Sequence, residues 1–263
     1  MPEWSNGTVC KTVSASFHKF ESCSQHMNLK GKTILITGAT GGIGSVLASH
    51  LAHEGSNLIL LGRDSDKLTS LLENLDHPDH HTIYTCNLTS STDRTELIKQ
   101  IQKTHPKIDI LINNAGIGIY KPSSDISPSE WKESYELNVH TPFFLSQSLT
   151  PTITINIGSC SAVQYKEMRT LYNSTKAALR SLTLSLSLEH PGKYTHITLD
   201  STLTPFGPLT LKEKQKRLDN GMQYLSPDWV SEKITKILQD DKRESEYCLS
   251  PHCYDECGVW KKP

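Results

Sequence analysis

The sequence predicts an α/β fold in which a parallel, doubly wound sheet lies between two layers of helices. Three observations support this prediction. Short apolar, β-branched runs alternate with helix-periodic segments from about residue 30 to residue 245. The apolar runs lack polar alternation, which is typical of strands buried on both faces. A glycine-rich turn follows the first run, where doubly wound sheets bind phosphate groups.

The first half of the chain alternates strand and helix in regular steps. Residues 32–38 (KTILITG) predict a buried strand. Residues 43–55 predict a helix that ends at Gly55. The alternation continues with strands at 57–62, 81–87 and 108–116 and helices at 64–75 and 93–105.

The second half continues the same alternation. It predicts helices at 129–149, 170–190 and 226–241 and strands at 152–158 and 196–203. Ser226 and Pro227 are suited to the N-cap and the first position of the last helix. Residues 205–225 are expected to form a loop and a short helix.

The domain organisation follows from the absence of any linker between these elements. We expect a single domain over residues 27–247, after a flexible extension at 1–26. The tail at 248–263 contains Cys248, His252, Cys253 and Cys257, but their spacing matches no pair of zinc knuckles. We therefore expect no metal site.

Composition narrows the possible functions. Lys and Arg number 27 and Asp and Glu 28, so a net charge of -1 gives no support for binding nucleic acid or an anionic membrane. No run of about 18 apolar residues predicts a membrane span. The seven cysteines are an odd number without framework spacing, which indicates reduced thiols and a cytoplasmic protein.

The turn TGATGGIG (37–44) joins the first strand to its helix. Its glycines allow a tight turn and let a pyrophosphate approach the main chain, where the helix N-terminus attracts negative charge. A glycine turn at this junction indicates dinucleotide binding. The residues expected to contact the cofactor here are Gly38, Thr40, Gly42, Ile43 and Gly44.

The end of the second strand indicates which dinucleotide is bound. An acid there would bind the ribose 2′-hydroxyl of NAD, but Gly62 is followed by Arg63. A guanidinium suits the 2′-phosphate of NADP, so we predict NADP (NADPH) in preference to NAD. The alternative is that Arg63 is a solvated surface residue.

Tyr172 and Lys176 form another candidate site. At a spacing of four they lie on one face of the predicted helix, so a lysine charge could lower the pKa of the tyrosine. The pair alone also fits two surface residues on one helix turn.

These motifs occur in an order that resembles the short-chain dehydrogenase/reductase family in its compact, single-domain form. The resemblance spans about residues 30–245. It is based on Thr-Gly-x-x-x-Gly-x-Gly at 37–44, Asn-Asn-Ala-Gly at 113–116, Asn138, Ser159, and Tyr-x-x-x-Lys at 172–176.

The resemblance implies a Rossmann fold and a role for each motif residue. Tyr172 would act as general acid and base, and Lys176 would lower its pKa and bind the nicotinamide ribose. Ser159 would bind the substrate oxygen, and Asn138 would hold a water linked to Lys176. Further cofactor contacts are implied for Asn87, Asn114, Ala115, Gly116, Tyr172, Lys176 and Thr210.

The implied function is NADP-dependent interconversion of a carbonyl compound and an alcohol by hydride transfer. The substrate would be a small molecule, and the family implies a homodimer or homotetramer. Two alternatives remain open. One is a catalytically weak or non-enzymatic NADP-binding regulator, and the other is a sugar-nucleotide epimerase-like enzyme.

The chain departs from the family pattern at four places. Asn87 replaces a usual acid, and the segment between Asn138 and Ser159 is short, so its helix must end near Pro151. Pro205-Phe206 stands where the family has Pro-Gly, with Gly207 one residue later. Asp200 interrupts the apolar strand at 196–203 without an evident reason.

Overall fold

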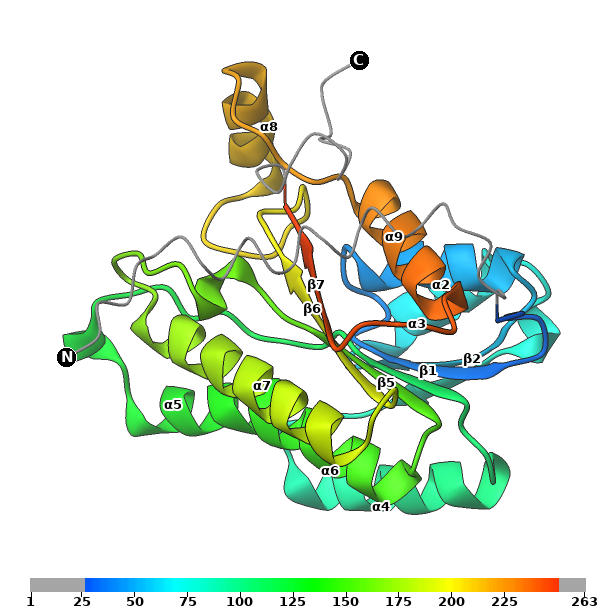
Figure 1. The fold of residues 1–263 in the computed structure, drawn as a ribbon. Coiled ribbons are helices and arrows are strands. Elements are labelled where there is room, and N and C mark those ends of the chain that lie inside the picture. Colours follow the sequence, from blue (N-terminus) through cyan, green and yellow to red (C-terminus); the bar gives the residue numbers. More distant parts are fainter. Residues whose placement is uncertain (1–26, 251–263) are drawn as a thin grey trace.

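The structure is a computed structural model that describes residues 27–250. Its centre is a seven-stranded parallel sheet with the strand order β3-β2-β1-β4-β5-β6-β7 (Figure 1). The strands are β1 Thr33–Thr37, β2 Asn57–Gly62, β3 Thr82–Thr85, β4 Ile110–Asn113, β5 Ile153–Ile157, β6 Tyr194–Leu199 and β7 Glu246–Leu249. The chain reverses direction across the sheet between β1 and β4, as a doubly wound fold requires.

Helices cover both faces of the sheet (Figure 1). One layer holds α2 (Gly44–His53), α3 (Ser65–Glu73) and α9 (Pro227–Gln239). The other holds α4 (Ser91–Thr104), α5 (Pro128–Tyr135), α6 (Thr141–Leu149) and α7 (Thr170–Glu189). Helix α8 (Leu211–Asp219) stands apart from both layers. Four short helices complete the described chain: η1 Pro78–His80, η2 Ser123–Asp125, η3 Glu136–His140 and η4 Cys160–Ala162.

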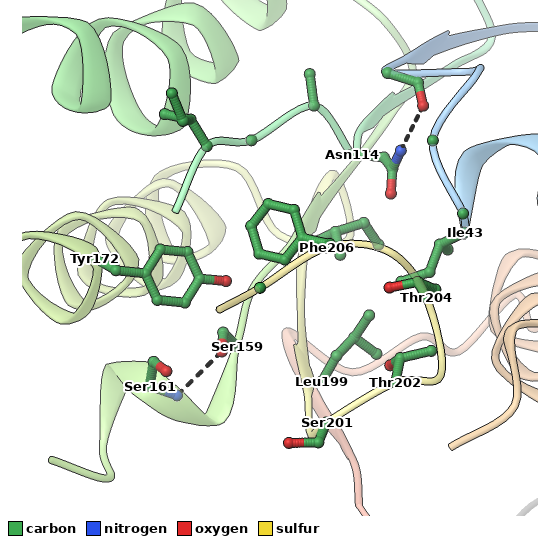
Figure 2. A pocket seen from close by; sticks show the side chains of 18 of the residues that line it. Ile43, Asn114, Ser159, Ser161, Tyr172, Leu199, Ser201, Thr202, Thr204 and Phe206 are labelled. Atoms are coloured by element: carbon green, nitrogen blue, oxygen red, sulfur yellow. Dashed lines mark hydrogen bonds between the residues drawn. The ribbon is translucent and has the colours of Figure 1, made fainter. Parts of the chain in front are cut away.

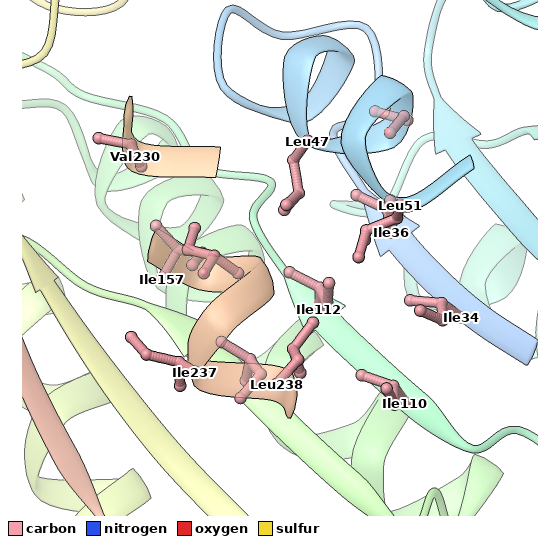
Figure 3. Close-up of a cluster of buried hydrophobic side chains, with 14 of the residues drawn as sticks. Ile34, Ile36, Leu47, Leu51, Ile110, Ile112, Ile157, Val230, Ile237 and Leu238 are labelled. Atoms are coloured by element: carbon pink, nitrogen blue, oxygen red, sulfur yellow. The ribbon is translucent and has the colours of Figure 1, made fainter. Parts of the chain in front are cut away.

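Two hydrophobic cores hold the three layers together. Ile34 and Ile36 of β1 face α2 and α9, whereas Leu35 between them faces the opposite layer. Figure 3 shows the first core, where Leu47 and Leu51 of α2 approach the strands. This alternation explains why both positions of each strand are apolar in the sequence. The predicted three-layer, doubly wound fold is confirmed.

The C-terminal edge of the sheet differs from the prediction. Residues 246–249 form β7, which pairs in parallel with β6, so the expected boundary after residue 247 falls inside a strand. The predicted extension at 1–26, and His252, Cys253 and Cys257 of the predicted tail, lie outside the described residues. Within residues 27–250, no helix is long and apolar enough to cross a membrane.

The short segment between Asn138 and β5 is accommodated by two local features. Helix α6 ends at Leu149, and Thr150 adopts a left-handed conformation with φ of 45° before β5 begins at Ile153. The predicted helix 129–149 is interrupted by η3, one turn of π-helix that contains Asn138. Pro142 cannot donate to the Asn138 carbonyl, and a wider turn relieves the clash between its ring and that carbonyl.

A nearly buried ion pair fastens the π-turn to α4. Arg94 lies 2.6 Å from Glu136, and its Nη1 also donates to the Leu88 carbonyl at 3.0 Å. We expect Glu136→Gln to lower the free energy of unfolding by about 2 to 3 kcal/mol, because a buried guanidinium loses its counter-charge.

Urea denaturation measures this effect. The control is Glu232→Gln, which breaks an exposed pair with Lys236 on α9. The control should change stability by less than about 1 kcal/mol. Equal losses in the two variants would show that the burial of Arg94 does not matter.

Candidate active site

A cavity of about 810 Å³ lies at the carboxyl ends of the central strands. It runs from the glycine turn and the end of β2 to the N-terminal part of α7, and its volume suits a large organic ligand. Of the residues predicted from the sequence, eleven line it: Gly38, Thr40, Gly42, Ile43, Arg63, Asn114, Ala115, Gly116, Ser159, Tyr172 and Lys176.

The glycine turn is packed so closely that no side chain fits at Gly42 or Gly44. A Cβ on Gly44 would lie 2.2 Å from the Gly38 carbonyl oxygen, and one on Gly42 would lie 2.7 Å from Thr204. Gly44 does not line the cavity itself, but its lack of a side chain lets α2 begin directly against the turn. The cavity therefore has main-chain walls beside a helix N-terminus, which suits a pyrophosphate.

The Asn-Asn-Ala-Gly motif supports this turn from the neighbouring strand. The Asn114 side chain donates to the carbonyls of Thr37 and Gly38 at 3.1 and 3.0 Å. The Thr37 hydroxyl accepts from the main-chain N–H groups of Asn114 and Ala115, both at 3.0 Å. These bonds link β1 to β4 and fix the shape of the cavity floor.

Tyr172 lies at the other end of the cavity, on the first turn of α7 and facing Ser159 (Figure 2). Its ring packs against Tyr120 and Phe206, with centroids 5.5 and 5.9 Å away. Burial raises the pKa of Tyr172, and this outweighs the opposite effect of the Ser159 hydroxyl. The phenol is therefore protonated at neutral pH. Ser159 accepts from the Ser161 N–H at 3.1 Å, which leaves its own proton for a ligand.

Lys176 lies one helix turn beyond Tyr172 and is also buried. Its Nζ donates to the Ile157 carbonyl at 2.9 Å and lies 5.9 Å from the Tyr172 ring centroid. Burial lowers the pKa of Lys176 to about 8. The net shift of the Tyr172 pKa is upward, because burial outweighs the opposing effects of the Ser159 hydroxyl and the Arg169 charge, so the predicted lowering by Lys176 is not seen in it.

Asn138 does not line the cavity, but it lies close to the helix turn that carries Tyr172 and Lys176. It exchanges two hydrogen bonds with the main chain of Ile117, at 2.8 and 2.9 Å, and donates to Thr175 Oγ1 at 3.0 Å. Thr175 precedes Lys176 on α7. Despite the short segment before β5, Asn138 thus reaches the α7 turn that carries Tyr172 and Lys176.

The structure does not bring Asn87 or Thr210 to the cavity, contrary to the prediction. Asn87 Oδ1 accepts from the main chain and the hydroxyl of Thr89, which closes a local turn. Thr210 is the N-cap of α8 and forms a capping box with Glu213. Both side chains satisfy nearby backbone groups, as is common for Asn and Thr beside helices.

The loop after β6 contributes Phe206 to the cavity wall, and Lys214 of α8, which the sequence did not single out, holds this loop. Gly207 adopts φ of 115°, so it takes the conformation that glycine permits, one residue later than in the family pattern. The Phe206 side chain lies in the cavity near Tyr172 (Figure 2). Lys214 of α8 is buried and donates from Nζ to the carbonyls of Thr202, Thr204 and Phe206, which fixes this loop.

Asp200 acquires an explanation in the structure. Its carboxylate accepts from the Ser201 N–H at 2.6 Å, the Ser250 hydroxyl at 2.7 Å and the Cys160 thiol at 3.5 Å. It therefore joins the ends of β5, β6 and β7 beside the cavity. The sequence shows the acid but not the three segments that meet there.

The fold and the cavity define a dinucleotide-dependent enzyme, and comparison with known proteins gives its family. Residues 32–205 match the model of the short chain dehydrogenase family. The chain belongs to this family, and it is an oxidoreductase that acts on CH–OH groups with a nicotinamide cofactor.

Individual relatives agree with this assignment. The chain is 32% identical over 168 residues to an uncharacterized oxidoreductase of Staphylococcus aureus (strain USA300), over 61% of this chain and 72% of the relative. An alcohol dehydrogenase from Thermococcus sibiricus, complexed with 5-hydroxy-NADP, aligns with a TM-score of 0.73 and 25% identity over 84% of this chain and 96% of its own. L-sorbose reductase of Gluconobacter frateurii, complexed with NADPH and L-sorbose, shares the fold, with a TM-score of 0.76 and 21% identity over 85% of this chain and 97% of its own.

Proposed function

We propose that this enzyme interconverts a small carbonyl compound and its alcohol with NADP, using Tyr172 as the general acid and base. The observation that carries the proposal is the position of Ser159, Tyr172 and Lys176 at one end of the cavity that begins at the glycine turn. A cofactor that extends along this cavity from the turn would present its reactive end to these three side chains.

Each side chain has a distinct role in reduction. The cofactor supplies the hydride for the carbonyl carbon. Tyr172 gives its phenolic proton to the carbonyl oxygen, and the Ser159 hydroxyl donates a hydrogen bond to the same oxygen. The positive charge of Lys176 stabilises the phenolate that remains, and Asn138 holds the α7 turn through Thr175.

The fit of the cavity to NADP depends on the residues at the end of β2, at the opposite end of the cavity from Tyr172. Arg63 and Lys67 both line it beside the end of β2, and the acid there, Asp64, caps α3 and pairs with Lys67. The NADP complexes of the T. sibiricus and G. frateurii enzymes support a dinucleotide with the extra phosphate. In this chain Arg63 would bind the 2′-phosphate by charge-assisted hydrogen bonds.

We expect Arg63→Ala to weaken NADPH binding by about 10- to 100-fold and to leave NADH binding unchanged, because only NADPH carries the phosphate. Titration of each cofactor by fluorescence measures both dissociation constants. Tighter binding of NADH than NADPH by the unaltered protein would overturn the NADP preference.

Turnover tests the proposed reaction. A panel of aldehydes and ketones should contain compounds that oxidise NADPH in the presence of the enzyme, with alcohol as the product. Binding of NADPH without turnover of any compound would favour the regulator alternative. Epimerisation of a sugar nucleotide without net NADPH oxidation would favour the alternative of an epimerase-like enzyme.

We further propose that one domain extends from residue 27 through β7, that the enzyme is cytoplasmic, and that it forms a homodimer or homotetramer. Trp131 of α5, Phe144 of α6 and Leu188 of α7 are large apolar side chains exposed on the helical layer that carries Tyr172. A second copy would bury this apolar surface.

A further inference from the structure

The substrate end of the cavity carries a guanidinium that the reaction itself does not use. Arg169 precedes the first turn of α7, three residues before Tyr172, and lines the cavity. Its Cζ lies 5.6 Å from the centroid of the Tyr120 ring, which in turn packs against the Tyr172 ring. This cation–π contact with Tyr120 fixes the position of the guanidinium, whose N–H groups remain available for hydrogen bonds.

The Arg169 guanidinium has no ion-pair or side-chain hydrogen-bond partner within residues 27–250. Two acids line the described part of the cavity, and both are engaged elsewhere. Asp64 caps α3 at the far end, and Asp200 accepts from Ser201, Ser250 and Cys160. The half-buried charge of Arg169 is therefore left without a counter-charge from residues 27–250.

Neighbouring cations strengthen the positive character of this end. Lys214 donates to three carbonyls, and its pKa is lowered by burial and by the charge of Arg169. Lys166 and Arg217 line the same cavity. Several cations lining one cavity favour the binding of an anion there.

We propose that the substrate is an oxo acid, or a hydroxy acid in the reverse direction, whose carboxylate Arg169 binds through paired hydrogen bonds. This assignment rests on the proposed function, because the carbonyl must lie against Ser159 and Tyr172 while the carboxylate reaches Arg169. Tyr120 contacts both Arg169 and the Tyr172 ring, so the guanidinium lies one aromatic ring away from Tyr172, which suits a short oxo acid. The planar fork of a guanidinium matches a carboxylate, and pairing removes the cost of the uncompensated charge.

Matched substrates test this proposal directly. The experiment compares the rates at which the enzyme reduces acetoacetate and methyl acetoacetate, and 4-oxopentanoate and its methyl ester, each with NADPH. In each pair that the unaltered enzyme reduces, kcat/KM should be at least about 10-fold higher for the acid than for its methyl ester. Arg169→Gln should lower kcat/KM for the acid by about 10- to 100-fold, chiefly through KM, and change that of the ester less than threefold.

Two further variants separate the charge of Arg169 from its structural contribution. Arg169→Lys keeps the charge and should recover part of the loss for the acid. Lys212→Gln removes an exposed cation of α8 that does not line the cavity, so it should leave both substrates unaffected. The dissociation constant for NADPH should stay the same in all three variants.

The outcomes also distinguish this inference from the proposed function. Esters and simple ketones reduced as well as the acids, with no effect of Arg169→Gln, would overturn the inference and leave carbonyl reduction standing. A preference for dihydroxyacetone phosphate over every oxo acid would indicate a phosphate as the ligand of Arg169 and also overturn the inference.

If none of these compounds is reduced, calorimetric titration of 4-oxopentanoate into the NADPH complex tests whether Arg169 binds a carboxylate. Binding lost in Arg169→Gln supports the anion site, and equal or absent binding in both proteins overturns it.

Discussion

Replacing Tyr172 by phenylalanine should reduce kcat by about 10³-fold or more, while the dissociation constant for NADPH changes little. The substitution removes one hydroxyl and keeps the ring that packs against Tyr120 and Phe206. Because the phenol is buried and its pKa is raised, it is protonated at neutral pH and can act as an acid. Without its proton, the charge that develops on the substrate oxygen has only the Ser159 hydroxyl to stabilise it.

The cavity supplies a matched control for this experiment. Tyr120 is a second tyrosine on the cavity wall, and burial raises the pKa of its phenol to about 12. Tyr120 lies in the loop between β4 and η2 and not on a helix beside a buried lysine, so Tyr120→Phe should lower kcat by less than about 10-fold. Steady-state rates with NADPH and a responsive ketone measure both variants. Similar losses in the two would show that Tyr172 has no special role in proton transfer.

The fold was predictable because its signals are local. The apolar runs of β1, β2, β4 and β5 are buried on both faces, and the glycine turn has space for no other residue at Gly44. The site residues that line the cavity come from strand ends and from one helix turn. The parallel sheet brings such strand ends to one edge, so their order along the chain was sufficient to place them together.

The remaining features depend on contacts between distant segments. Arg169 acquires its position from Tyr120, 49 residues earlier, and Lys214 is buried because three carbonyls of another segment accept from it. Strand β7 was missed because a four-residue run carries little periodic signal and pairs only at the edge of the sheet. Asn87 and Thr210 were expected in the cavity, but short polar side chains also bind nearby backbone groups, and the sequence does not reveal which partner prevails.

Lys176→Met should lower kcat by about 10²-fold or more, because the phenolate of Tyr172 loses the positive charge that stabilises it. The same substitution should raise the melting temperature at pH 7 by about 2 to 6 °C. Burial lowers the folded-state pKa of Lys176 from 10.5 to about 8, so at pH 7 the protein folds with a charge that water would solvate better. Methionine fills a similar volume without that charge.

The pH dependence of this stabilisation follows from the same shift. Below about pH 8 the lysine is charged in both the folded and the unfolded states, and the cost of its burial is fully present. Between pH 8 and 10.5 the folded state has released its proton while the unfolded state retains it, so the cost declines as pH rises. The difference in melting temperature between Lys176→Met and the unaltered protein should therefore be largest at pH 7 and nearly absent at pH 10.5.

Lys214→Met provides the opposite case within the same cavity. Lys176 and Lys214 are similarly buried, with 5% and 6% of their surface exposed. Lys176 donates to one carbonyl, whereas Lys214 donates to three. Removal of Lys214 leaves the Thr204 and Phe206 carbonyls without that donor, while the Thr202 carbonyl still accepts from the Thr204 N–H. The melting temperature of Lys214→Met should therefore be lower than that of the unaltered protein, whereas the melting temperature of Lys176→Met should be higher. Equal falls in both variants would show that the hydrogen bond from Lys176 to the Ile157 carbonyl outweighs the cost of desolvation.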